Sequence, residues 1–200
     1  MWYYIGAERG DTMTDYSNHY FETVEDIENY VEQLRNKLKR YHGSVTDVIK
    51  LLNIYGIRVQ LAYLEDGVSS YMVSNSETDD SVIIVDANMD RAHQRLVLAL
   101  ELGKYLFEGK NKKHYEHVRF ENEEVNEEKQ KRSECFATTF LVPKEEFQYY
   151  CQTLEYMNYS EDEMLENLAD YFEVPKEIIR QRQDYLKQSE DAHVIVKTRG

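Results

Sequence analysis

The stretch Val97-Leu-Ala-Leu-Glu-Leu-Gly-Lys-Tyr-Leu-Phe107 decides the fold of this chain. Its apolar residues recur every three or four positions, which predicts a helix over residues 90–108 with one buried face. The residues expected on that face are Leu96, Ala99, Leu100, Gly103 and Leu106 or Phe107. One carboxylate, Glu101, lies within this apolar stretch, and it is the first candidate site residue.

The helix is one of several landmarks that resemble a known family in order and spacing, over about residues 45–187. These landmarks are Ser81-Val-Ile-Ile-Val-Asp86, Arg95, Leu100-Glu-Leu-Gly-Lys-Tyr-Leu-Phe107, Phe136-Ala-Thr-Thr-Phe-Leu-Val-Pro143, Leu168-Ala-Asp-Tyr-Phe-Glu-Val174, Arg182 and Leu186. Together they resemble the ImmA/IrrE family of metallopeptidases. The resemblance implies an α+β, zincin-like fold, which we expect to be a helical bundle with a small three-stranded antiparallel sheet.

The resemblance also implies where the zinc ligands of the family would fall. The family helix typically reads Leu-Ala-His-Glu-Leu-Gly-His, which places the two histidines on Leu100 and Lys104 and the general base on Glu101. The third, acidic ligand falls on Arg132. Leucine has no lone pair, and the basic side chains would have to lose a proton beside a cation. We therefore expect no metal, no cofactor and no catalysis, with Glu101 a vestige of the former site.

The sequence leaves open how Glu101 is used. In one hypothesis Lys104 and Arg132 fill the vacated volume and pair with Glu101. In the other, Glu101 and Lys104 form an exposed pair three residues apart, which contributes little to stability.

A metallopeptidase with relocated ligands is a further alternative, ranked last because histidines on loops and acids on helices are usually solvated. Its candidate ligands are His93, His114, His117, Glu127, Glu128 and Glu134. Cys135 follows Glu134 but has no identifiable imidazole partner, so we expect a packed thiol rather than a nucleophile.

Hydrophobic periodicity and capping residues predict the other elements. Before the motif helix we expect helices at 22–41, with Thr23 as N-cap, and 44–55, then strands at 57–64, 69–74 and 81–85. Asp66-Gly67 indicates a hairpin turn, and Asp86 is a candidate cap of the motif helix. After it we expect helices at 124–142, 143–152, 161–172 with Ser160 as N-cap, and 175–186, and a strand at 192–197.

These elements suggest one domain with three parts. Residues 1–43 form an N-terminal extension and helix, residues 44–142 a peptidase-like core of sheet and two motif helices, and residues 143–200 a C-terminal helical segment.

Charge and composition narrow the classes of partner. The chain has 24 basic and 38 acidic residues, a formal net charge of −14, so its field repels phosphate and disfavours direct nucleic-acid binding. No apolar run approaches the ~20 residues that span a bilayer, and Cys135 and Cys151 are too few for a disulfide scaffold. These features favour a cytoplasmic protein. The oligomeric state is not determined by the sequence.

The stretch Glu155–Glu173 contains seven acids and no basic residue, with tyrosines between them. It is either a solvated helix face or an imitation of the charge of a nucleic-acid backbone. The candidate partner-binding residues are Tyr156, Tyr159, Glu161, Asp162, Glu163, Glu166 and Asp170.

Two functions from different classes follow. Active family members are carried by phages and mobile elements, where they inactivate a helix-turn-helix repressor. The resemblance thus implies a pseudo-peptidase that binds a regulator such as a repressor stoichiometrically. The alternative is an acidic inhibitor that mimics nucleic acid and blocks a host-defence nuclease, of the anti-CRISPR or anti-restriction type. The expected partner is a protein in both cases.

Overall fold

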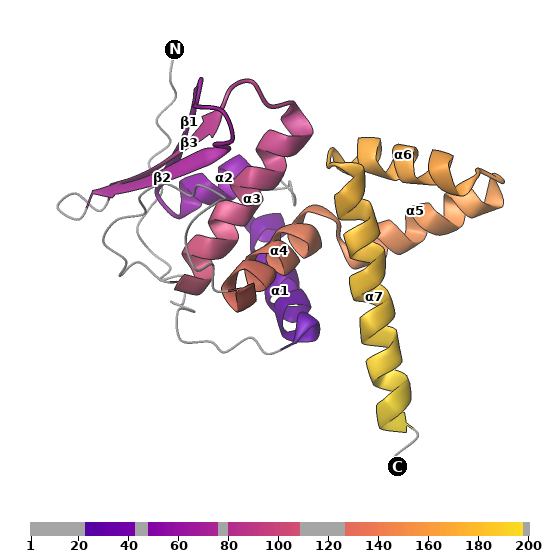
Figure 1. The fold of residues 1–200 in the computed structure, drawn as a ribbon. Coiled ribbons are helices and arrows are strands. Elements are labelled where there is room, and N and C mark those ends of the chain that lie inside the picture. Colours follow the sequence, from indigo (N-terminus) through magenta and orange to yellow (C-terminus); the bar gives the residue numbers. More distant parts are fainter. Residues whose placement is uncertain (1–22, 43–47, 76–79, 109–126, 198–200) are drawn as a thin grey trace.

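The computed structural model describes residues 23–42, 48–75, 80–108 and 127–197 (Figure 1). Within them the elements, in chain order, are α1 (Val24–His42), α2 (Val48–Ile54), β1 (Ile57–Ala62), β2 (Ser70–Asn75), β3 (Asp80–Asp86), α3 (Arg91–Glu108), α4 (Glu127–Leu141), α5 (Lys144–Tyr156), α6 (Glu161–Phe172) and α7 (Lys176–Lys197). The predicted α+β class is confirmed, and α3 is the predicted motif helix.

The sheet is mixed, so the prediction of an antiparallel sheet was wrong. β3 is the central strand, parallel to β1 and antiparallel to β2. The turn at Asp66-Gly67 exists, with Gly67 at φ +82°, but it lies in a loop that carries the chain past β3 to the far edge of the sheet. It is therefore not a hairpin turn. The apolar run Val82–Val85 takes the centre, where a strand is paired on both sides.

Local capping explains where the helices begin. The Thr23 hydroxyl accepts a hydrogen bond from the Asp26 amide at 3.1 Å, which confirms Thr23 as the N-cap of α1. Ser160 forms a reciprocal capping box with Glu163, which confirms it as the N-cap of α6. The cap of α3 is Asp90, which accepts from the His93 amide at 2.9 Å. The candidate cap Asp86 instead accepts from the Leu64 and Asn88 amides and fixes the loops at the end of β3.

One hydrophobic core joins the sheet to the helices. Ile57, Met72 and Ile83 project from the three strands into it, and α2 and α3 lie against the sheet. α4 packs on α3 and is itself covered by α1 and α7. The core therefore extends from the first described helix to the last.

The C-terminal elements form a separate layer beside this body (Figure 1). α5 and α6 fold back on each other, and α7 packs on α6 and α4 before it runs away from the sheet. Residues 192–197, predicted as a strand, continue α7 as helix. Their β-branched residues favour a strand only where a neighbouring strand can pair with them, and α7 directs them away from the sheet.

α3 and α4 approach each other most closely at Gly103. A Cβ atom there would lie 3.1 Å from Phe136 Cδ1 and 3.2 Å from the Ser133 Cα atom. Because the second neighbour is backbone, the two helices would have to move apart to admit a side chain.

We expect Gly103→Val to lower the free energy of unfolding by about 2–3 kcal/mol, measured by urea denaturation. Gly103→Ala should cost less, since the helix propensity of alanine offsets part of the clash. Ala92→Val, in the first turn of the same helix, is the control and should cost well under ~1 kcal/mol. Equal losses at positions 92 and 103 would contradict the close approach.

No helix in the described ranges is both long and apolar enough to cross a membrane.

Candidate functional site

Glu101 points into the junction between α3 and the sheet. It is 4% exposed, and its Oε1 atom accepts a hydrogen bond from the Ser70 hydroxyl of β2 at 3.1 Å. Ser70 follows the inward alternation of β2, two residues before the buried Met72. Ser70 was not predicted as a partner of Glu101, although an inward-facing serine on a strand is a usable signal.

Lys104 completes the environment of Glu101. Its Nζ atom donates to Glu101 Oε1 at 2.9 Å from one helical turn away, and its side chain is 24% exposed. The predicted pair between Lys104 and Glu101 is thus present, and it is not the exposed surface pair of the alternative. A carboxylate at this depth needs its charge balanced, which Lys104 does.

Arg132 lies on α4 next to Ser133, at the close approach to Gly103. Its guanidinium donates to Glu128, one turn earlier on the same helix. The ion pair of Arg132 is therefore within α4, whereas that of Lys104 is with Glu101.

Leu100, the third of the predicted ligand positions, lines a cavity of about 510 Å³ between α3, α4 and α7. Its lining combines apolar and polar side chains. The lining residues are Leu96, Leu100, Glu134, Thr138, Glu177, Ile178, Arg180, Gln181 and Asp184. We call this the α3/α4/α7 cavity. Glu101, Lys104 and Arg132 are not part of its lining.

The sequence model of the IrrE N-terminal-like domain, a peptidase family, matches residues 53–183. The chain belongs to this family. The match runs from the end of α2 into α7 and so includes the sheet, the motif helix and the α3/α4/α7 cavity.

Other comparisons add little to this assignment. No curated protein is significantly similar to this IrrE-like chain in sequence. Among solved structures, a Mycobacterium tuberculosis transcriptional regulator matches with a TM-score of 0.48 and 17% identity, over 82% of this chain and 47% of that protein. The IrrE-like chain thus spans about half the length of that regulator.

The candidate ligands of the relocated metal site are dispersed. His93 pairs with Asp90 at the exposed start of α3, and Glu128 pairs with Arg132. Glu134 accepts from Gln130 at 2.8 Å. The described part of the chain holds no group of three potential ligands, while His114 and His117 lie outside the described residues and the side chain of Glu127 is not described.

Cys135 is a buried side chain on α4. Burial in apolar surroundings raises the pKa of its thiol to about 12, which leaves almost no thiolate at neutral pH. Burial also raises the pKa of the half-buried Cys151, to about 11. Both values argue for packed thiols rather than a nucleophile.

We expect iodoacetamide to modify native Cys151 faster than native Cys135. A pKa one unit lower gives about ten times more thiolate at pH 8, and Cys151 is also more accessible. Peptide mass spectrometry after timed quenching measures both rates, and denaturation in urea should make them equal. Faster modification of Cys135 in the native protein would contradict its burial.

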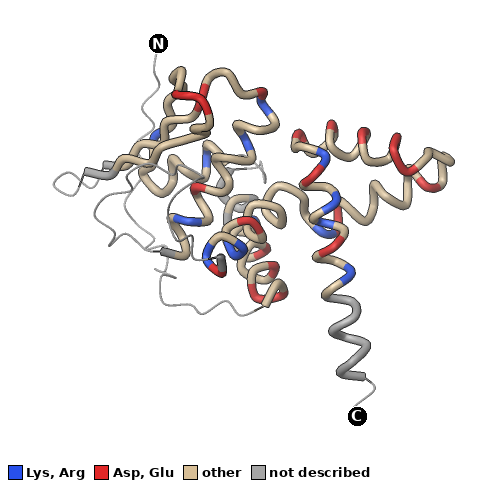
Figure 2. The backbone as a smooth tube through the Cα atoms, in the orientation of Figure 1, with Lys and Arg blue, Asp and Glu red and all other residues tan. Residues whose placement is uncertain are grey.

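The acids of α6 all lie at the surface of this IrrE-like chain (Figure 2). Glu161, Asp162, Glu163, Glu166 and Asp170 are exposed, and Glu166 forms an ion pair with Lys176. Tyr156, the last residue of α5, is 89% exposed, and Tyr159, just before α6, is 37% exposed. The predicted partner-binding residues are thus all accessible at the surface of the C-terminal layer.

Proposed function

We propose that this chain is a catalytically inactive member of the IrrE-like family, carried by a phage or mobile element. It acts by stoichiometric binding of a regulator protein, such as a repressor, at the α3/α4/α7 cavity. The proposal rests mainly on the burial and the hydrogen-bond partners of Glu101. The residue at the position of the family's general base is buried and engaged by Ser70 and Lys104.

The chemistry of the former ligand positions supports the loss of the metal. Leu100 offers no donor atom, and the Lys104 ammonium group is paired with Glu101. The Arg132 guanidinium carries only N–H donors and offers no lone pair to a metal ion. These side chains do not fit a zinc ion, so we assign the chain no hydrolytic step.

The cavity supports the binding function. A concave surface that combines apolar Leu96, Leu100 and Ile178 with polar side chains is typical of a recognition site. Its volume of about 510 Å³ suits a few side chains of a partner.

Affinity capture from the source cell tests the proposal. The tagged wild-type chain should retain one dominant protein, and Leu100→Glu should reduce its recovery at least tenfold, because a charge placed in the apolar wall loses its hydration when the partner docks. The matched control is Leu61→Glu, which alters an exposed leucine on β1 and should leave recovery unchanged. Equal recovery with Leu100→Glu would exclude this cavity.

The inactive state has its own test. Purified protein supplied with Zn²⁺ should not cleave the captured partner, and Glu101→Gln should not alter that result. Zinc-dependent cleavage that Glu101→Gln abolishes would overturn the proposal.

The exposed acids and tyrosines of α6 favour a second candidate, inhibition of a host-defence nuclease by mimicry of nucleic acid. It predicts that recovery of the partner falls steeply between 0.1 and ~0.5 M salt. The double variant Asp162→Lys/Asp170→Lys should lose the partner while Leu100→Glu keeps it. The opposite pattern supports the cavity.

A further inference from the structure

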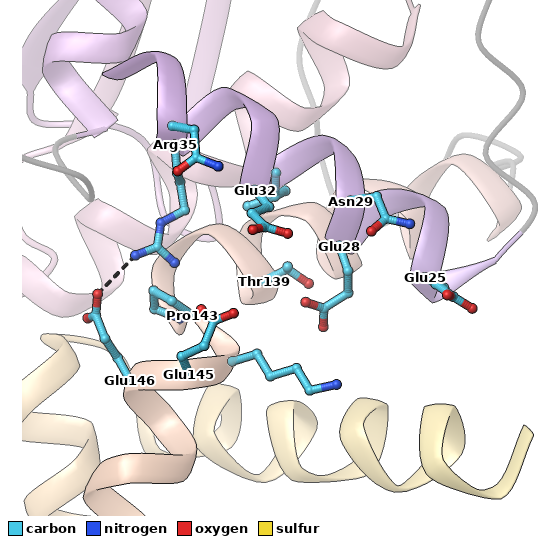
Figure 3. Close-up of a pocket in the computed structure, with 12 residues that line it drawn as sticks. Glu25, Glu28, Asn29, Glu32, Arg35, Thr139, Pro143, Glu145 and Glu146 are labelled. Atoms are coloured by element: carbon cyan, nitrogen blue, oxygen red, sulfur yellow. Dashed lines mark hydrogen bonds and ion pairs between the residues drawn. The ribbon is translucent and has the colours of Figure 1, made fainter. Parts of the chain in front are cut away.

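A second cavity, of about 680 Å³, lies between α1, the end of α4 and the start of α5. Five carboxylates line it, from Glu25, Glu28, Glu32, Glu145 and Glu146. Figure 3 shows Glu28 and Glu32 on α1 facing Glu145 at the start of α5, with Thr139 between them. We call it the acidic cavity.

Ion pairs within the described part of the chain neutralise only some of these carboxylates. Glu28 binds the buried Arg182, and Glu146 binds Arg35 at 3.0 Å. Glu25, Glu32 and Glu145 form no ion pair within the described part of the chain. Glu145 is attracted by the charge of Arg35 at longer range, and Lys144 is the other cation in the lining. Carboxylates brought together without counter-charges repel one another, and a cationic ligand would relieve that repulsion.

Thr139 supplies an independent sign of a ligand. Its side chain is 3% exposed, lies in the wall of the acidic cavity, and has no hydrogen-bond partner for its hydroxyl. The Cys135 sulfur, one turn earlier on α4, is near enough to interact weakly with this hydroxyl. No group, however, forms a hydrogen bond of ordinary geometry with the Thr139 oxygen. A buried hydroxyl without a partner is costly, so a ligand group in the cavity would satisfy it.

Arg35 limits which cation fits. It lines the same cavity, and its Nε–H group is buried without an acceptor. A metal ion or a polyamine has no acceptor to offer this donor. A peptide carries carbonyl oxygens as well as cationic side chains, so it alone of the three can satisfy both Arg35 and the carboxylates.

The spacing on α1 fits an extended peptide. Glu25 and Glu32 lie seven residues apart on a helix, about 10 Å along its axis. In the polyproline II form of an extended chain, which has three residues per turn, two basic residues three positions apart point to the same side and lie about 9 Å apart.

We propose that the acidic cavity binds an extended basic segment of a protein, with arginine or lysine side chains on Glu25, Glu32 and Glu145. Its main-chain carbonyls accept from Arg35 Nε and from the Thr139 hydroxyl. This site is separate from the α3/α4/α7 cavity and does not depend on the function proposed there.

A fluorescein-labelled peptide, Ala-Arg-Ala-Ala-Arg-Ala, tests the proposal by fluorescence anisotropy with the full chain. Glu25→Gln/Glu32→Gln should weaken its binding about tenfold or more, because charge-assisted hydrogen bonds are lost. The control, Asp162→Asn/Asp170→Asn, removes the same charge from α6 and should change the affinity less than twofold. Equal effects of the two double variants would show attraction by net charge alone and overturn the site.

Thr139→Val keeps the shape of the side chain and removes only the hydroxyl. It should weaken the peptide at least threefold while the melting temperature stays the same or rises, because no internal hydrogen bond is lost. Unchanged affinity would overturn the role of Thr139.

Competition with spermidine and Mg²⁺ distinguishes a basic peptide from a polyamine or a metal ion as the ligand. Neither should displace the peptide at equal charge concentration, and a peptide with glutamine in place of arginine should not bind. Stronger binding of spermidine or Mg²⁺ than of the arginine peptide would overturn the proposed ligand class.

Discussion

Glu28→Ala is expected to lower the free energy of unfolding by about 3 kcal/mol. The guanidinium of Arg182 is fully buried on α7, and both of its terminal nitrogens donate to the Glu28 carboxylate on α1, with Nη2 at 3.1 Å from Oε2. Removal of Glu28 leaves a buried charge without its partner, the costliest way to break an ion pair. Urea denaturation followed by circular dichroism measures the loss.

A double variant distinguishes the contribution of the ion pair from the cost of leaving one buried charge without its partner. Glu28→Leu/Arg182→Met replaces both charges by apolar side chains and should recover most of the lost stability. Breaking the exposed pair of Glu166 and Lys176 with Glu166→Ala is the control and should cost less than ~1 kcal/mol. If Glu28→Ala cost no more than that control, the pair would not hold α1 to α7.

Restoration of the family ligands should create a zinc site. We expect Leu100→His/Lys104→His/Arg132→Glu to bind one Zn²⁺ per chain with a dissociation constant below about 1 μM, or roughly 8 kcal/mol. Positions 100 and 104 lie one turn apart on α3, and position 132 adjoins the contact of Ser133 with Gly103. The two helices are therefore close enough to hold one ion.

Competition with a zinc-binding dye measures the affinity of this variant. Leu100→His/Lys104→His, with two ligands, should bind at least tenfold more weakly and serves as the control. Failure of the triple variant to bind better than the double variant would mean that position 132 does not reach the ion. That result would contradict the alignment of Arg132 with the third ligand.

Local signals predicted most of the elements. The apolar spacing around Leu100, the cap residues Thr23 and Ser160, and the break at Pro143 all act over a few residues, and the helices begin or end close to where those residues predict. Residues 192–197 were the exception, because strand propensity has no effect without a neighbouring strand.

Short stretches of sequence predicted neither which strands pair nor which residues contact the buried charged side chains. Asp66-Gly67 indicated a turn correctly, but nothing near it shows that β3 rather than β2 pairs with β1. In the same way, the family landmarks in the sequence indicated Glu101 and Arg182 but not their hydrogen-bond partners, which are Ser70 for Glu101 and Glu28 for Arg182.

The sequence alone determined the family of this chain and most of its helices, and it predicted that Leu100, Lys104 and Arg132 stand at the family's ligand positions. Tertiary structure decided the strand order, the burial of Glu101 beside Ser70, and the meeting of acids from α1 and α5 around Thr139. The reason is physical. Periodicity and capping depend on neighbours within a turn or two, whereas these contacts join residues far apart in the chain, 154 positions for Glu28 and Arg182, and form only when the whole core packs.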